Sequence, residues 1–286
     1  MGEIIKAIRE LLGMSQSDIA KLLNVSFATV NRWENNRTVP SKVIQSGLFE
    51  LCKSRNISVY NLVLQKIKHT ADMIELRPGH ILLYHGSKSG IKGKIRPISR
   101  RQCDFGQGFY MGTEPGQALT LICDYDDSKF YILSVDLESL QSVEIPANID
   151  WAMLVAYNRG KMDKIQGTPL YDLYRNMSSG KDLIIGSIAN DRMFYVIDNF
   201  FVGNITDMAL VHSLSALQLG KQYVAITQVA CDAVQIEAEI PLSHLERLAI
   251  KELAEENRLK GVSCANQICK EYRREGLFFD EILDQN

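Results

Sequence analysis

The sequence predicts an α+β protein with an all-α N-terminal part, a middle part of mixed strands and helices, and a helical C-terminal extension. Apolar residues recur at three- and four-residue spacing through about the first 68 residues, which is typical of helices. After Arg77-Pro78-Gly79, short apolar and aromatic runs broken by glycine predict strands. From about Leu242 the chain turns helical and charge-rich again. We therefore expect three parts, residues 1–70, 78–241 and 242–286.

Five short helices are predicted in the first part from their start and stop signals. The first helix carries apolar residues up to Leu12 and ends at Gly13. Ser15-Gln-Ser-Asp18 is similar to a capping box, with Asp where Glu is usual, and it starts the second helix. That helix is expected to end near Asn24, because asparagine tolerates the left-handed conformation. The remaining helices are expected to start at Ser26, at Pro40-Ser41 and at Ser58, the last running to Lys68.

The middle part alternates between predicted strands and predicted helices, with no internal repeat and no low-complexity segment. Strands are expected at His80–Tyr84, Gly108–Met111, Phe130–Val135 and Tyr223–Thr227. Helices are expected at Gln117–Tyr125, Ile149–Asn158 and Thr206–Leu219.

Composition and charge limit the classes of protein to consider. Hydrophobic residues make up 46% of the 286, and no apolar run approaches the ~20 residues that cross a bilayer. The six cysteines show no CxxC pattern, so we expect no metal site and reduced thiols in a cytoplasmic protein without a membrane partner. Residues 1–70 hold ten Lys and Arg against five Asp and Glu, whereas the remainder is acidic. Only the first part is therefore expected to meet nucleic acid directly.

Residues Met14–Pro40 resemble the helix-turn-helix family of the Cro and lambda-repressor type. The resemblance is carried by the small Ala20, the turn Asn24-Val25-Ser26, the apolar pair Val30 and Trp33, and the ending Arg32-Trp33-Glu34-Asn35. It implies that a second helix enters the major groove and reads base edges. Such modules usually read two half-sites, so a homodimer is also expected. The residues expected to contact DNA are Gln16, Phe27, Ala28, Thr29, Asn31, Arg32, Asn36 and Arg37.

Three separated strings in the middle part carry a second resemblance. They are Leu83-Tyr-His-Gly-Ser87, Asp104-Phe-Gly-Gln-Gly-Phe-Tyr-Met-Gly-Thr113 and Gly220-Lys-Gln-Tyr-Val-Ala-Ile-Thr227. Their order over roughly residues 80–240 resembles the diphtheria-toxin and PARP-like class of ADP-ribosyltransferases, and most nearly a bacterial branch described only as a domain of unknown function. The resemblance implies a split β-sheet and NAD as substrate. It also implies mono-ADP-ribosyl transfer to a macromolecular acceptor, in a toxin or phage-defence setting.

Residue by residue, the resemblance implies a catalytic set of His85, Tyr110 and Gln222. His85 would hold a ribose hydroxyl, and Tyr110 would offer its ring to the nicotinamide. Gly86 would let the backbone approach the carboxamide closely. Each residue also has a structural alternative, as a strand-end histidine, a core tyrosine and a surface glutamine respectively. The residues expected to contact NAD are His85, Gly86, Ser87, Gly108, Phe109, Tyr110 and Gln117.

Gln222 departs from the family pattern, which usually has an acidic residue there, and it brings no charge. Asp104, Asp182 and Asp191 are candidates for the missing acid, and Asn190-Asp191-Arg192 for a substrate loop. A rival hypothesis follows, namely a transcriptional regulator that binds NAD or a related nucleotide without chemistry. The amphipathic tail packs on the body or receives a small antitoxin-like partner. A basic run either cradles the NAD pyrophosphate, binds a nucleic-acid substrate or lies in a solvated loop, and it consists of Lys88, Lys92, Lys94, Arg96, Arg100 and Arg101.

Overall fold

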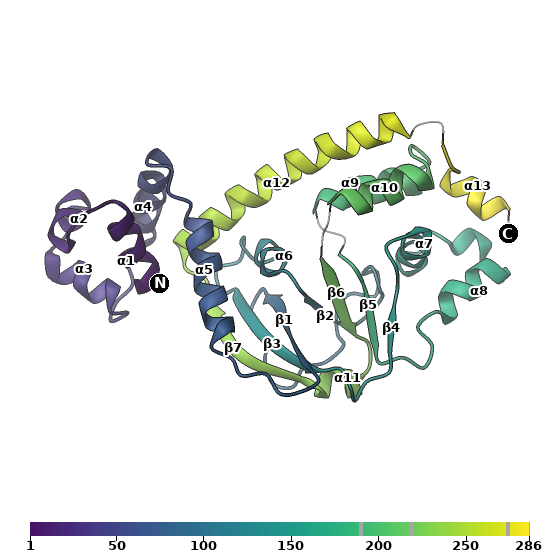
Figure 1. Cartoon of the computed structure of the whole chain (residues 1–286), viewed down its shortest axis with the longest axis horizontal. Helices are drawn as coiled ribbons and strands as arrows, with labels where there is room; N and C mark the ends of the chain where they lie inside the picture. The colour runs from purple at the N-terminus through teal and green to yellow at the C-terminus, as the bar shows by residue number, and fades with distance from the viewer. Residues whose placement is uncertain (189–190, 218–219, 273–274, 286) are drawn as a thin grey trace.

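The computed structural model describes residues 1–188, 191–217, 220–272 and 275–285, and the side chains of 191–195, 214–217 and 265 lie outside the description. Five N-terminal helices form a lobe at one end of the molecule, and a seven-stranded sheet with its surrounding helices forms the rest (Figure 1). A long helix, α12, spans the molecule from the first lobe to the helices on the far side of the sheet. The predicted order of helical, mixed and helical parts is confirmed.

The N-terminal lobe contains the five predicted helices. Ser15 and Asp18 form the expected capping box, Gly13 and Asn24 adopt positive φ, and the helix expected to end at Lys68 continues to Asp72. The side chains of the four capping serines each accept a hydrogen bond from a backbone N–H of the first helical turn. The helices are α1 Gly2–Leu11, α2 Gln16–Leu22, α3 Phe27–Glu34, α4 Lys42–Ser54 and α5 Val59–Asp72.

The sheet has the order β4-β5-β6-β2-β1-β3-β7, with β4 and β5 parallel and the other neighbours antiparallel. β1 pairs along its whole length with β3, but it meets β2 at a single residue pair, Tyr84 opposite Gly112. The split sheet expected above is thus one sheet with a narrow join. The strands are β1 His80–Ser87, β2 Phe109–Gly112, β3 Lys129–Asp136, β4 Ser142–Glu144, β5 Leu183–Ser187, β6 Lys221–Ala225 and β7 Val234–Pro241.

Helices flank the sheet and extend from it. Several predicted boundaries were wrong, and the strand expected over His80–Tyr84 continues to Ser87. The helix expected over Gln117–Tyr125 ends at Thr120, and the strand expected over Tyr223–Thr227 ends at Ala225 because Thr227 caps the next helix. The helix expected at Ile149–Asn158 has those bounds. The helical elements are α6 Pro115–Thr120, α7 Ile149–Asn158, η1 Asp163–Ile165, α8 Pro169–Asn176, α9 Asp191–Phe201, α10 Asp207–Leu217, α11 Gln228–Asp232, α12 His244–Glu271 and α13 Phe279–Asp284.

One hydrophobic core crosses the expected boundary at residue 70. Buried residues of α1, α4 and α5 pack in the same cluster as Leu119 of α6, Phe130 of β3 and Leu245 of α12. Lys66 Nζ of α5 lies 2.9 Å from Glu246 Oε1 of α12. The N-terminal lobe therefore packs directly against the sheet and the first turns of α12, and it is not joined to them by a linker alone.

Candidate functional site

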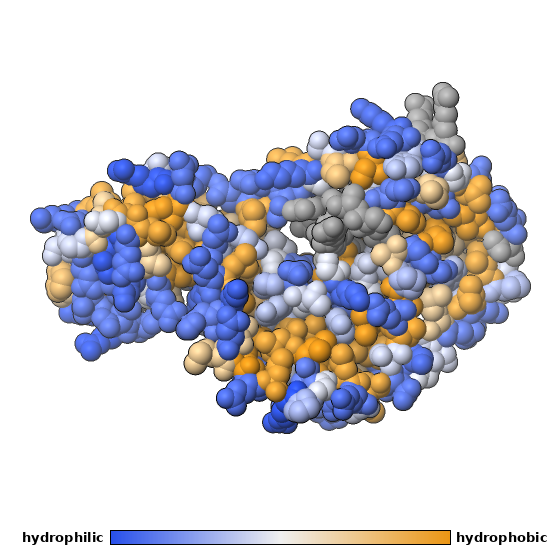
Figure 2. Space-filling view, viewed as in Figure 1, coloured by the Kyte–Doolittle hydropathy of each residue, from blue (hydrophilic) through white to orange (hydrophobic). Residues whose placement is uncertain are grey.

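The surface of α2 and α3 is arranged as the resemblance predicts. Val30 and Trp33 are buried, whereas Ala28 and Arg32 are exposed and Phe27, at the start of α3, keeps 53% of its surface exposed. Figure 2 shows mostly hydrophilic residues over this side of the N-terminal lobe. A helix that buries one face and presents a polar face at the end of the molecule has the geometry needed to enter a DNA groove.

A polar network fixes α2 and α3 relative to each other. Arg9 of α1 donates from Nε to Glu34 Oε1 at 2.6 Å, and Gln16 Nε2 donates to Glu34 Oε2 at 2.6 Å. Asn31 Nδ2 in turn donates to Gln16 Oε1 at 3.3 Å. Gln16 and Asn31, both expected to contact DNA, are therefore held in place before any ligand arrives. Sequence patterns pointed to neither Arg9 nor the pairing role of Glu34.

Two other residues expected to contact DNA have local partners. Asn36 adopts φ 53° and its Oδ1 accepts from Gly2 N at 2.8 Å, while the Thr29 hydroxyl lies 2.8 Å from that of Ser26. By contrast, the exposed Arg32 and Arg37 side chains make no hydrogen bond or ion pair with any residue that the structure describes. These two cations are thus available for phosphates or bases.

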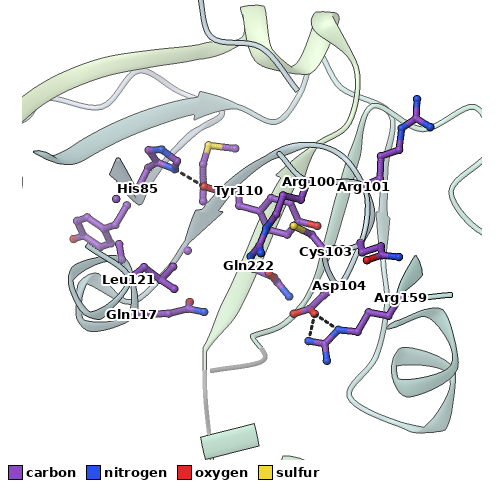
Figure 3. A pocket seen from close by; sticks show the side chains of 16 residues that line it. His85, Arg100, Arg101, Cys103, Asp104, Tyr110, Gln117, Leu121, Arg159 and Gln222 are labelled. Carbon is purple, nitrogen blue, oxygen red and sulfur yellow. Dashed lines mark hydrogen bonds and ion pairs between the residues drawn. The ribbon is translucent and has the colours of Figure 1, made fainter. Parts of the chain in front are cut away.

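A pocket of about 730 Å³ opens beside the narrow join of the sheet (Figure 3). β1 contributes His85 and Gly86, β2 contributes Tyr110, and β6 contributes Gln222. The remaining walls come from α6, from the loop preceding β2 and from Arg159 after α7. Segments far apart in the sequence therefore meet here because the strand order places β1, β2 and β6 side by side.

His85 is held in one orientation and one tautomer. Its Nδ1 lies 2.7 Å from the carbonyl oxygen of Tyr110, and since a carbonyl only accepts, Nδ1 carries the proton. Its ring packs on Phe109 with 4.4 Å between ring centroids. Burial lowers the pKa of His85, which the Tyr110 carbonyl opposes only in part, so the ring is neutral near pH 7. Nε2 is then an acceptor, and no described residue hydrogen-bonds to it.

Tyr110 uses its hydroxyl to hold the loop before β2. The hydroxyl donates to Gly106 O at 2.7 Å and accepts from Phe105 N at 3.0 Å, and burial raises the pKa of Tyr110 far above its ordinary value. Its ring remains part of the pocket wall. Gly108 is needed in the same loop because a Cβ there would lie 2.5 Å from Val224 Cγ1.

Asp104 and Gln222 lie together in the pocket wall. Arg159 donates to Asp104 Oδ1 from Nε at 3.1 Å and from an Nη at 2.6 Å, and the Asp104 side chain is 12% exposed. Gln222 is buried and donates from Nε2 to Ser187 O at 2.9 Å. Burial raises the pKa of Asp104, and the opposing effects of Arg159 and Gln222 do not offset it. The pocket thus holds a desolvated carboxylate beside a neutral amide.

The structure separates the residues expected to contact NAD into two groups. His85, Gly86, Tyr110 and Gln117 line the pocket, as does Gln222. Gly86 also has a packing reason, because a Cβ there would lie 2.3 Å from Ala118 O of α6. The expected contacts that do not line the pocket are Ser87, Gly108 and Phe109.

The other charged candidates also divide. Arg100 and Arg101 line the pocket, but Lys94 pairs with Asp232, and Lys88 donates to the Tyr125 hydroxyl at 2.6 Å. The expectation that Asp182 supplies the missing acid was wrong, because its carboxylate accepts from Thr227 and from the Gln141 backbone outside the pocket. The expected substrate loop at Asn190-Asp191-Arg192 lies outside the described residues, apart from the backbone of Asp191 and Arg192.

Sequence reasoning missed Arg159, Cys103 and Leu121 of the pocket wall. Arg159 follows α7 and is 55 residues away from the carboxylate that it binds, so no local pattern joins the two. Among the residues that the structure describes, no group of three or more His, Cys, Asp or Glu side chains could hold a metal ion. No described helix is long and apolar enough to cross a membrane.

Fold and site together define a protein of two parts, a helix-turn-helix DNA-binding module and a mixed sheet that carries a polar pocket. The family model for "Helix-turn-helix" matches residues 5–43. The family model for "Protein of unknown function (DUF3990)" matches residues 81–236, more than half of the chain, and the chain belongs to this family. No curated protein and no solved structure matches the chain.

Proposed function

We propose that the protein is a mono-ADP-ribosyltransferase of toxin or phage-defence type, which transfers ADP-ribose from NAD to a macromolecular acceptor. The observation that carries this proposal is the pocket at the narrow join of the sheet. His85, Tyr110 and Gln222, from the three strings that resemble transferases, line that pocket together. The sheet order brings them together, because β1, β2 and β6 are neighbours, and it is this combination of residue types that supports the proposal.

The chemistry of the pocket suits an NAD molecule. Its volume lies within the range of ~300 to 1,000 Å³ typical of small-molecule sites. The neutral His85 offers Nε2 as an acceptor for a ribose hydroxyl, and the Tyr110 ring offers a face for the nicotinamide. Arg100 and Arg101 place two cations at the same cavity, where a diphosphate would be bound by charge-assisted hydrogen bonds.

The DNA-binding module has two roles compatible with this activity. It binds the promoter of its own gene and regulates expression, or it delivers the transferase to a DNA-bound acceptor. A homodimer would place two modules on neighbouring half-sites. Residues of α5, α6 and α12 share one hydrophobic cluster, so the module packs directly against the part of the chain that carries the pocket.

A second candidate function is an NAD-sensing regulator without chemistry. Gln222 favours it, because its Nε2 is committed to Ser187 O and the side chain has no charge with which to stabilise a developing cation. In this hypothesis the same pocket binds the nucleotide and only the DNA-binding module responds.

The test is to incubate the purified full chain with NAD and cell lysate and to follow free nicotinamide and adducts by mass spectrometry. We expect nicotinamide release that His85→Ala abolishes, and that His80→Ala, outside the pocket on the same strand, leaves intact. The adduct would identify the acceptor. If His85→Ala leaves nicotinamide release unchanged, the pocket is not the site of the reaction. NAD binding in calorimetry without nicotinamide release supports the regulator. If the protein shows no NAD binding and no nicotinamide release, NAD is rejected as the ligand.

Overexpression gives a second readout of the same question. A transferase of toxin type arrests growth, and His85→Ala or Tyr110→Ala relieves the arrest. A regulator without chemistry is tolerated equally in all three forms. Relief by a co-expressed small protein would identify an antitoxin partner.

A further inference from the structure

Asp104 contributes the one carboxylate among the described residues that line the pocket. The same wall holds Arg100, Arg101 and Arg159, so the cavity would be strongly cationic without it. A cationic pocket attracts the diphosphate of NAD but repels its positively charged nicotinamide ring and the ribosyl cation that forms as that ring leaves. An acid is therefore needed somewhere in this cavity, and Gln222 does not supply it.

The position of Asp104 is determined from two sides by the end of α7. Asn158 Nδ2 donates to the Asp104 backbone carbonyl at 3.0 Å, and Arg159 binds the carboxylate. Both contacts from Arg159 end on Oδ1, while Gln222 lies beside the same carboxylate (Figure 3). The family resemblance expects an acid at position 222. The Asp104 carboxylate is held beside Gln222, although Asp104 belongs to a different segment of the chain.

We infer that Asp104, held in place by Arg159, is the acid–base residue of this pocket and takes over the role that the residue at position 222 cannot perform. This inference rests on the proposed function. Asp104 is thus a catalytic residue that contacts the substrate, and Arg159 is a positioning residue that acts through it. Burial raises the pKa of Asp104 above its ordinary value, which makes this carboxylate a stronger base than an exposed aspartate.

The bond between the ribose C1 and the nicotinamide nitrogen breaks, and its electron pair stays on that nitrogen, which becomes neutral. An O–H or N–H group of the acceptor bonds to C1, and its proton passes to the Asp104 carboxylate and then to water. NAD⁺ and acceptor–H give ADP-ribosyl-acceptor, nicotinamide and one proton.

The experiment compares Asp104→Asn, Asp104→Glu and Asp182→Asn in the full chain with NAD as the probe. Nicotinamide release is measured from pH 5 to pH 9, and NAD binding by calorimetry. We expect Asp104→Asn to lower kcat at least ~100-fold, the usual contribution of a general base, with NAD binding changed less than threefold. Asp104→Glu restores part of the rate. Asp182→Asn behaves as wild type, because Asp182 lies outside the pocket.

Arg159→Gln tests the role of Arg159 through the pH profile of the rate, which would not change if Arg159 had only a structural role. Removing the cation raises the pKa of Asp104 further, so the acid limb of the rate profile shifts to higher pH. A rise in KM with unchanged kcat in Asp104→Asn, or an acid limb that stays in place in Arg159→Gln, overturns the inference while leaving the transferase proposal intact. If Asp104→Asn does not fold, the inference is tested by the pH profile of Arg159→Gln and by the rate of Asp104→Glu. Wild-type protein that releases no nicotinamide overturns both.

Discussion

The DNA-binding surface and the pocket differ in the sequence separation of the residues that form them. The surface is built within Gln16–Arg37, and its residues are placed by the caps and helical phase of two neighbouring helices. The pocket joins residues from Tyr84 to Gln222, and they meet only after β1, β2 and β6 have paired. Local sequence patterns therefore define the first site, whereas sheet register and loop anchoring define the second.

The largest expected effect concerns a contact between the N-terminal lobe, which carries the DNA-binding surface, and helix α12 of the rest of the molecule. Glu246 is buried at the start of α12, where it pairs with Lys66 of α5 and with Ser243. Glu246→Gln leaves Lys66 without its partner and should destabilise the protein by roughly 3 kcal/mol. Denaturant unfolding followed at the same time by far-UV circular dichroism and tryptophan fluorescence measures the loss. If the lobe and the rest of the molecule unfold as one cooperative unit, both probes shift together. Separate shifts would show that they unfold as two independent units.

The same pair predicts a pH dependence. Burial, the largest single effect, would raise the pKa of Glu246, but Lys66 and the Ser243 hydrogen bonds together outweigh it and lower the pKa below 4.5. A group with a lowered folded-state pKa stabilises above its unfolded pKa and loses that contribution as pH falls through the folded value. The difference in stability between wild type and Glu246→Gln should therefore be constant from pH 8 to about pH 5 and shrink below pH 4.5. A difference that grows on acidification contradicts this assignment.

The second effect lies within the DNA-binding surface. Glu34 accepts hydrogen bonds from Arg9 and from Gln16. Its removal leaves the partly buried Arg9 with weaker partners, namely the Met14 carbonyl at 3.0 Å and the Glu10 carboxylate at 3.7 Å. Glu34→Ala should cost roughly 2 to 3 kcal/mol of stability, since bonds to charged groups are the stronger ones. DNA affinity should fall by more than unfolding alone explains, because Gln16 and Asn31 lose their fixed positions. Glu50→Ala, an exposed carboxylate on α4, is the control, and equal effects of the two would contradict the network's role.

These two regions also show how far prediction from sequence reaches. The capping box at Ser15 and Asp18 and the buried pair Val30 and Trp33 were predicted correctly, because each signal lies within one or two helical turns. The Arg9–Glu34 contact was missed because it joins two helices through residues that lie 25 positions apart in the sequence.

In the pocket, motif order brought out His85 and Gln222, but it misplaced Ser87 and Phe109. Arg159 had no signal, since its role exists only after the loop before β2 folds back against α7. Its position could not be deduced without the tertiary structure.

The third effect tests the packing around the pocket with a matched pair of glycines. A Cβ on Gly86 would lie 2.3 Å from Ala118 O, so Gly86→Ala forces α6 away from β1 and should cost about 1 to 3 kcal/mol. Gly47→Ala, within α4 and with open space around it, should instead stabilise by about 0.5 to 1 kcal/mol, because glycine is a poor helix former. Denaturant midpoints compare the two. Equal changes in stability for the two variants would show that the β1–α6 contact accommodates a Cβ at residue 86.

The smallest expected effect concerns one arginine of the DNA-binding surface. Arg37 is exposed, follows α3 and has no side-chain partner among the described residues, so its expected role is one phosphate contact. Arg37→Ala should weaken binding about equally for all DNA sequences and reduce the slope of log affinity against log salt by about 1. Arg32→Ala, on the exposed face of α3, should instead change the preference among sequences. Arg55→Ala, an equally exposed arginine at the end of α4, is the control. A salt slope that changes as much in Arg55→Ala as in Arg37→Ala would mean that DNA is bound through the net charge of the lobe rather than through the surface of α2 and α3.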